Sequence, residues 1–134
     1  MQEAQNTKVV QDIYAAFGRG DVHALLGLLD DTITWKPIQG AGTHVPTAGT
    51  RRGKAEVAEF FRLLAEGTTF EVFATRELVA ERDKVVALGH YVGVSKKTGR
   101  RFVSNWAMIF TVRGGTVVDF EELCDSAAIN AAWA

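Results

Sequence analysis

Cysteine is almost absent from the chain: Cys124 is the only one among 134 residues. An intrachain disulfide is therefore impossible, and a zinc site built on cysteine thiolates would lack ligands. The three histidines (His23, His44 and His90) show no spacing typical of a metal site. The sequence thus indicates no metal and no cofactor, and it suits the reducing cytoplasm.

Long apolar runs are also missing. No stretch approaches the roughly 18 apolar residues that a membrane-spanning helix needs, and the polar start at residues 1–8 is unlike a signal peptide. Basic charge is not in excess, since 15 Lys and Arg face 16 Asp and Glu. The basic clusters at residues 51–54 and 96–101 are interpreted as solvated turns rather than phosphate sites. We therefore expect neither a membrane nor a nucleic-acid partner.

Two familiar catalytic motifs do not occur. The sequence contains neither Gly-x-Ser-x-Gly, which marks nucleophilic hydrolases, nor a phosphate-binding Gly-x-x-x-x-Gly-Lys-Ser/Thr loop. Any chemistry must therefore be argued from individual side chains.

The composition is that of an ordinary globular domain, with 47% apolar and 23% charged residues. A chain of this length can bury a core without disulfides, and we expect a single domain spanning residues 1–134. Apolar residues at helical spacing predict helices over residues 9–17 and 54–66. Asp21 is a good N-cap for a second, short helix that contains Leu25, Leu26, Leu28 and Leu29.

Strand patterns dominate the second half of the chain. A short strand is predicted at residues 33–36, before Pro37, and a glycine-rich loop at 38–53 is expected to border a pocket. Four long strands with short turns follow at about residues 69–80, 84–94, 101–112 and 116–124, and Asp125 caps a final short helix. Helices first and an antiparallel meander afterwards define an α+β fold with helices covering one face of a curved sheet.

Four sequence segments, taken together in their order along the chain, resemble the NTF2-like superfamily in its SnoaL-like and ketosteroid isomerase-like branch. They are Tyr14-Ala-Ala-Phe17-Gly-Arg-Gly-Asp21, Asp31-Thr-Ile-Thr-Trp35, Arg52-Gly-Lys-Ala-Glu-Val57 leading to Phe60-Phe61, and Phe120-Glu-Glu-Leu-Cys-Asp125. The resemblance implies a cone-shaped antiparallel or mixed sheet, a cystatin-like α+β barrel wrapped over three N-terminal helices around an apolar pocket. It also implies a homodimer through the outer sheet face, which would carry Val103, Ala107, Ile109 and Thr111.

The last strand offers two faces, because side chains alternate. The resemblance favours Val118, Phe120, Glu122 and Cys124 as inward. A carboxylate among apolar neighbours has a raised pKa, which suits general acid or base catalysis. Glu122 could equally be a structural carboxylate bonded to a loop amide or an arginine. Glycosidase chemistry would need a second pocket carboxylate, and only Glu122 is available.

The preceding strands raise the same choice of face. Trp106 and Met108 belong to the bulkier face of their strand, which is the expected pocket lining, although Trp106 could be ordinary core. Between Tyr91 and His90, the resemblance to epoxide hydrolases places Tyr91 inward and His90 outward. Tyr14, Trp35 and Phe61 complete the expected lining.

Known catalytic sets of the family are not retained. The ketosteroid isomerase aspartate base would fall on Lys36, its protonated acid on Met108, and its tyrosine on Ile13, one step from Tyr14. The Arg, Asp and Asp of the epoxide hydrolases would fall on Gly89, Tyr91 and Glu122, so only one acidic position survives.

Three hypotheses remain open from the sequence. The first is a small enzyme that uses Glu122 as acid or base and Tyr91 as hydrogen-bond donor on a small apolar, oxygenated substrate. The second is a binding protein that uses the same pocket without turnover. The third is an interaction module based on the dimerising sheet face.

Overall fold

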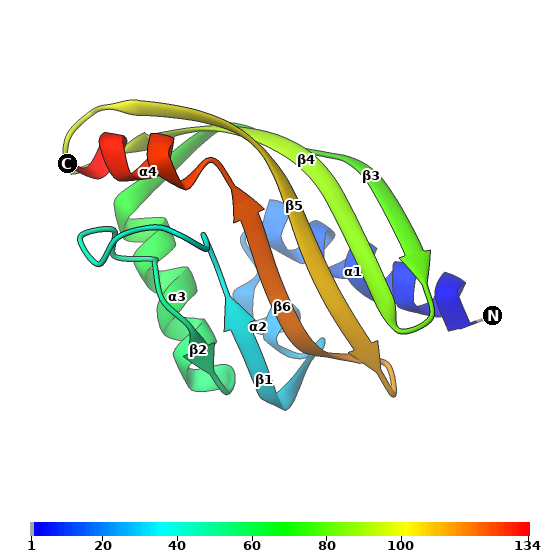
Figure 1. Cartoon of the computed structure of the whole chain (residues 1–134). Coiled ribbons are helices and arrows are strands. Elements are labelled where there is room, and N and C mark those ends of the chain that lie inside the picture. Colours follow the sequence, from blue (N-terminus) through cyan, green and yellow to red (C-terminus); the bar gives the residue numbers. More distant parts are fainter. Residues whose placement is uncertain (1) are drawn as a thin grey trace.

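The computed structural model describes residues 2–134 and shows an α+β fold (Figure 1). The helices are α1 (Gln2–Gly18), α2 (Val22–Leu26), α3 (Lys54–Gly67) and α4 (Ser126–Trp133). The strands are β1 (Leu29–Lys36), β2 (Arg51–Arg52), β3 (Thr68–Glu81), β4 (Lys84–Ser95), β5 (Arg101–Arg113) and β6 (Thr116–Cys124). Within residues 2–134, no helix is long and apolar enough to cross a membrane.

The six strands form one mixed sheet in the order β2-β1-β6-β5-β4-β3. Strands β3 to β6 are the predicted antiparallel meander, whereas β1 runs parallel to β6. The sheet is strongly curved, and its two edges do not join, so the expected cone is open rather than a closed barrel (Figure 1).

The helices lie inside the curve of the sheet and form the core with its concave face (Figure 1). Helices α1 and α3 bury apolar positions that their spacing predicts, such as Val10 and Ile13 from α1 and Val57, Phe60 and Phe61 from α3. Helix α4 lies across the end of the sheet at which β6 finishes, where it buries Ile129 and Trp133.

Several boundaries differ from the sequence prediction, since α1 begins at Gln2 rather than at residue 9 and β1 begins at Leu29 rather than at residue 33. Leu28 and Leu29 were expected in the second helix, but α2 ends at Leu26, and Leu29 begins β1 by pairing with Val117. Sheet pairing here outweighs a helical apolar pattern that is too short to hold a helix by itself. The loop expected at 38–53 contains the two-residue strand β2, whose Arg51 and Arg52 pair with Trp35 and Thr34.

On β4, β5 and β6 the faces follow the predicted alternation except at Thr111 and Val118; Thr111 was expected on the outer face but is only 3% exposed. Ala87, Gly89 and Tyr91 face inward from β4, as do Trp106, Met108 and Phe110 from β5. On β6, Phe120 and Glu122 are buried, but Val117 is buried in place of the expected Val118. A register shift next to Thr111 causes this change, because a bulge moves the following residues to the opposite face.

Candidate functional site

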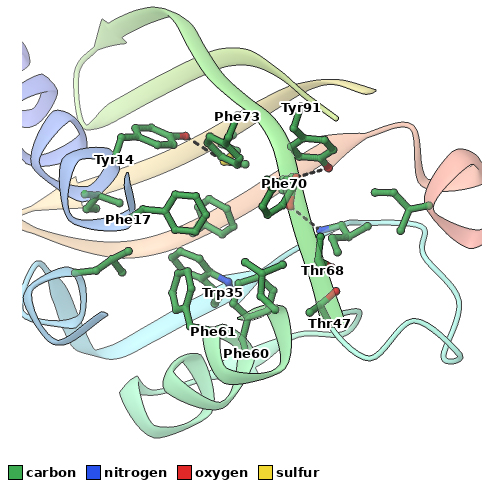
Figure 2. A pocket seen from close by; sticks show the side chains of 18 of the residues that line it. Tyr14, Phe17, Trp35, Thr47, Phe60, Phe61, Thr68, Phe70, Phe73 and Tyr91 are labelled. Atoms are coloured by element: carbon green, nitrogen blue, oxygen red, sulfur yellow. Dashed lines mark hydrogen bonds between the residues drawn. The ribbon is translucent and has the colours of Figure 1, made fainter. Parts of the chain in front are cut away.

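A cavity of about 70 Å³ lies between the concave face of the sheet and the helices (Figure 2). It is enclosed almost wholly by apolar side chains, as ligand pockets usually are. The lining residues are Ile13, Tyr14, Phe17, Leu25, Trp35, Ile38, Thr47, Phe60, Phe61, Leu64, Thr68, Phe70, Phe73, Tyr91, Phe102, Met108, Phe110, Phe120, Glu122, Ile129 and Trp133. Cavities of about 150 Å³ hold benzene, so the free space here suits a molecule of a few heavy atoms. A larger ligand would require the lining side chains to move.

Glu122 is the only acidic residue in the lining. Its side chain is 5% exposed, and it enters the cavity because Phe120 and Glu122 share the inward face of β6. The Tyr91 hydroxyl donates a hydrogen bond of 2.8 Å to Oε2 of Glu122, and the backbone N–H of Ile38 donates one of 3.2 Å to Oε1. Each carboxylate oxygen thus accepts one hydrogen bond and retains a free lone pair.

The pairing of strands β4, β5 and β6 explains how Tyr91 reaches Glu122. Tyr91 is opposite Ser104 on β5, and Glu122 is opposite Met108 on the other edge of the same strand. The two side chains therefore approach each other across β5, on the concave side. The sequence prediction that Tyr91 rather than His90 faces inward is confirmed. His90 lies on the outer face, where its Nδ1 is 2.9 Å from Oδ1 of Asn105.

Ile38 adopts an unusual backbone conformation at this site. Its φ is +44°, in the left-handed region that β-branched residues rarely occupy, and such strain often marks a functional position. The strained turn follows Pro37 and is fixed to β6 twice, because Ile38 N–H binds the Glu122 side chain while Gln39 N–H binds the Glu122 carbonyl at 3.2 Å. The turn therefore directs a backbone donor at the buried carboxylate.

Burial controls the protonation of both polar partners. Desolvation raises the pKa of the Glu122 carboxyl above its ordinary value of 4.5, and the hydrogen bonds from Tyr91 and Ile38 oppose this rise. Desolvation, with the charge of Glu122 as the second cause, raises the pKa of Tyr91 far above its ordinary value. Tyr91 therefore remains a phenol that donates a hydrogen bond, whereas Glu122, with its raised pKa, is the group of the pair suited to exchange a proton.

Two residues expected in the lining lie outside it. The Trp106 indole folds against the backbone of β4 at Gly89, where a Cβ would come within 2.2 Å of the ring, and Tyr14 stacks on it at 5.9 Å. Trp106 is thus a core residue. Cys124 is half-buried at the end of β6, opposite Trp106. Burial raises the pKa of its thiol to about 12, so Cys124 does not provide a thiolate nucleophile near neutral pH.

The structure places the remaining expected residues in the wall of this cavity: Tyr14, Trp35, Phe61, Met108 and Phe120. The Tyr14 hydroxyl contacts the Met108 sulfur at 3.1 Å, which is a weak acceptor. Trp35 stacks on Phe120 with ring centroids 3.8 Å apart. Its indole N–H is buried and has no hydrogen-bond partner among residues 2–134.

Sequence reasoning missed several members of the site. Ile38 and Thr47 come from the long loop, whose role at the pocket was expected without naming residues, and Thr68 begins β3. The other unpredicted members are apolar: Ile13, Phe17, Leu25, Phe60, Leu64, Phe70, Phe73, Phe102, Ile129 and Trp133. The only available signal was the spacing of the aromatic residues, which does not distinguish a cavity wall from a filled core.

Positive charge is absent from the cavity wall, which contains no Lys, Arg or His side chain. In the part of the chain that the structure describes, no group of three or more His, Cys, Asp or Glu side chains could hold a metal ion. The site therefore combines one buried carboxyl group, two phenols and two threonine hydroxyls with aromatic walls.

An open, curved sheet over helices is the fold shared with NTF2-like proteins of known structure. The model of the SnoaL-like domain matches residues 10–120, and the chain belongs to this family. The resemblance to the NTF2-like superfamily and its SnoaL-like branch is thereby confirmed.

Solved structures agree with this assignment. An NTF2-like protein from Burkholderia xenovorans LB400 is 31% identical, with 100% of this chain and 99% of that chain covered and a TM-score of 0.91. One from Burkholderia thailandensis E264 is 29% identical over 96% and 97% of the two chains, with a TM-score of 0.85. A proposed polyketide cyclase from Xanthomonas campestris pv. campestris is 21% identical. The match covers 100% of this chain and 100% of that chain with a TM-score of 0.80, which shows that the fold is shared. No curated protein matches the sequence.

Proposed function

We propose that the protein is a small enzyme that moves protons on a small, apolar, oxygenated substrate, with Glu122 as the proton-transferring group. The observation that carries this proposal is the buried Glu122 carboxyl, which lines the cavity and accepts hydrogen bonds from Tyr91 and Ile38. A carboxyl group with a raised pKa and no cationic partner is suited to general acid–base catalysis.

Proton abstraction beside a carbonyl group illustrates the chemistry. Ionised Glu122 takes the proton from the carbon, a new O–H bond forms at the carboxyl group, and the C–H electron pair moves toward the carbonyl oxygen. Return of the same proton to the same or a neighbouring carbon completes exchange or isomerisation. The hydrogen bonds from Tyr91 and Ile38 hold the carboxylate in one orientation. They also offset part of the desolvation cost of its ionised form in the apolar cavity.

The shared fold is compatible with this class of reaction, since one structural relative is a proposed polyketide cyclase and another a proposed isomerase. Both are 21% identical to the chain, so their names supply a reaction class to test rather than a substrate. The cytoplasm stays our predicted location, on the basis of the single cysteine.

Hydrogen–deuterium exchange of a small ketone tests the proposal without knowledge of the natural substrate. We expect the wild-type protein to accelerate exchange of the α-hydrogens of 2-butanone in D₂O, followed by NMR, above the rate in buffer alone. The rate should follow an ionisation above pH 4.5, since only ionised Glu122 can act as base. No acceleration at any pH between 5 and 9 would contradict the proposal and leave the non-catalytic binding protein as the better account.

We also propose a homodimer formed through the outer face of the sheet. Apolar side chains line this face in two cross-strand rows, Leu88–Ala107–Leu123 and Val72–Val92–Val103. Val103 is 51% exposed and Leu123 is 48% exposed in the single chain. An apolar patch of this kind on a soluble protein often marks an interface.

Light scattering tests the dimer directly. At micromolar concentration, we expect twice the chain mass of 14.6 kDa for the wild type and a single chain mass for Val103→Glu, because a buried unpaired carboxylate opposes association. Circular dichroism should show an unchanged fold in the variant, since Val103 points away from the core. A wild-type mass equal to one chain would exclude the dimer.

A further inference from the structure

Two threonine hydroxyls in the cavity wall have no role in the chemistry described above. Thr47 is 3% exposed and Thr68 is 9% exposed, and both line the cavity that contains Glu122 (Figure 2). Among residues 2–134, Thr47 enters a hydrogen bond only through its backbone carbonyl, and neither hydroxyl has a partner. In the described part of the chain, the fully buried polar side-chain atoms without a partner belong to Trp35, Gln39 and Trp106, so both threonine hydroxyls keep some accessible surface, and a ligand atom in the cavity can provide their partner.

Both threonines are held in place by their surroundings. Arg51 Nη1 donates hydrogen bonds to the carbonyls of Thr47 at 3.3 Å, Ala48 at 2.8 Å and Gly49 at 2.5 Å, and its guanidinium lies 5.7 Å from the ring centre of Phe60. The loop that carries Thr47 is therefore fixed against α3.

Thr68 is equally constrained. It begins β3 opposite Ser95, directly after Gly67, where a Cβ would come within 2.7 Å of the Trp133 ring. The close packing of Gly67 against α4 leaves little freedom for the backbone that positions the Thr68 hydroxyl.

The threonine hydroxyls supply a hydrogen-bond donor for a substrate oxygen, which an ionised carboxyl group cannot supply. Tyr91 and Ile38 both donate to Glu122, so neither donor is free to bind a substrate oxygen. A threonine hydroxyl can donate a hydrogen bond to a carbonyl, ether or hydroxyl oxygen and can also accept one.

We propose that Thr47 and Thr68 form a polar subsite that binds an uncharged oxygen atom of the ligand, so that the site selects small neutral oxygenated molecules over anions of the same shape. The unpartnered hydroxyls define the binding group. The lack of a cationic side chain, together with Glu122, disfavours an anion in the same cavity. This ligand class deepens the proposed function and rests on the same cavity, but binding can be measured without turnover.

Three probes of similar shape separate the possibilities: 2-butanone, its hydrocarbon counterpart 2-methyl-1-butene, and propionate. Their affinities are measured by NMR titration of wild-type protein, Thr47→Val, Thr68→Val and the double variant. Each single valine is expected to weaken 2-butanone binding by about five- to tenfold and to leave 2-methyl-1-butene binding unchanged or stronger, because one hydrogen bond is lost from the ketone alone. Propionate should bind more weakly than 2-butanone to every variant.

Thr111→Val is the matched control, since Thr111 is also buried but lies outside the cavity and accepts a hydrogen bond from Lys84. It should not change the affinity of any probe. Thermal unfolding should show that Thr47→Val and Thr68→Val keep the fold, because valine has nearly the shape of threonine and neither hydroxyl bonds another residue among residues 2–134.

Several results would overturn the subsite. They are equal losses for ketone and hydrocarbon, no change in ketone affinity in either valine variant, preference for propionate, or no saturable binding of any probe. A failure of the proposed catalysis looks different, since ketone exchange would be absent while the hydroxyl-dependent selectivity persisted.

Discussion

Glu122→Gln is expected to slow the exchange of 2-butanone α-hydrogens by about 100-fold or more, which is the usual contribution of a general base. The amide keeps the shape of the side chain but cannot take up a proton. Its oxygen can accept the hydrogen bond from Ile38 while its NH₂ group donates to the Tyr91 oxygen, because a phenol both donates and accepts. The variant should therefore fold and retain ketone binding.

Glu121→Gln is the control for this experiment. Glu121 neighbours Glu122 on the same strand but faces the other side of the sheet, opposite Ile109, and does not line the cavity. The Glu121→Gln variant should exchange the α-hydrogens of 2-butanone at the wild-type rate. If Glu122→Gln retained full exchange activity per folded molecule, the carboxyl group would be a structural residue, as the sequence also allowed.

Trp35→Ala is expected to lower the free energy of unfolding by about 3–5 kcal/mol. The indole is 4% exposed, stacks on Phe120, and contacts Phe60 and Phe61 with ring centroids 5.8 and 5.5 Å away. Its removal leaves a void beside the existing cavity, so the contacts of three aromatic rings are lost together. Urea unfolding measures the change.

Trp35→Phe is the matched variant, because it keeps an aromatic ring on Phe120 and removes the indole N–H that has no partner. We expect a clearly smaller loss than for alanine. The affinity of 2-methyl-1-butene should change in Trp35→Ala, since the residue forms part of the cavity wall. Large destabilisation with unchanged probe binding would show that Trp35 is core alone.

Much of the fold could be predicted because long strands alternate apolar and polar residues in the sequence. Alternation over β4, β5 and β6 assigned Tyr91, Met108, Phe120 and Glu122 to the inward face, and the structure confirms all four. The choice between the two faces came from the resemblance to the family rather than from alternation, which is symmetric. The same reasoning failed at Val118, since a bulge leaves no mark in the sequence.

The contacts that define the site were less predictable. Nothing in the sequence indicates that Ile38 adopts a left-handed conformation or that its N–H reaches a carboxylate 84 positions away. Thr47 and Thr68 line the cavity only because the loop and the end of α3 meet the concave face of the sheet. Conversely, Trp106 was expected in the lining because its face is inward, but the lack of a side chain at Gly89 lets the indole fold against β4.

The central claim is that a buried, proton-exchanging carboxyl group lies in the cavity, and a pH titration of the Glu122 side-chain carboxyl carbon by NMR tests it most directly. The Glu122→Gln variant assigns the signal. We predict a pKa above the ordinary value of 4.5, because desolvation outweighs the hydrogen bonds from Tyr91 and Ile38. The pKa should rise further in Tyr91→Phe, which removes one donor to the carboxylate. A pKa at or below 4.5 in the folded wild-type protein would contradict the account.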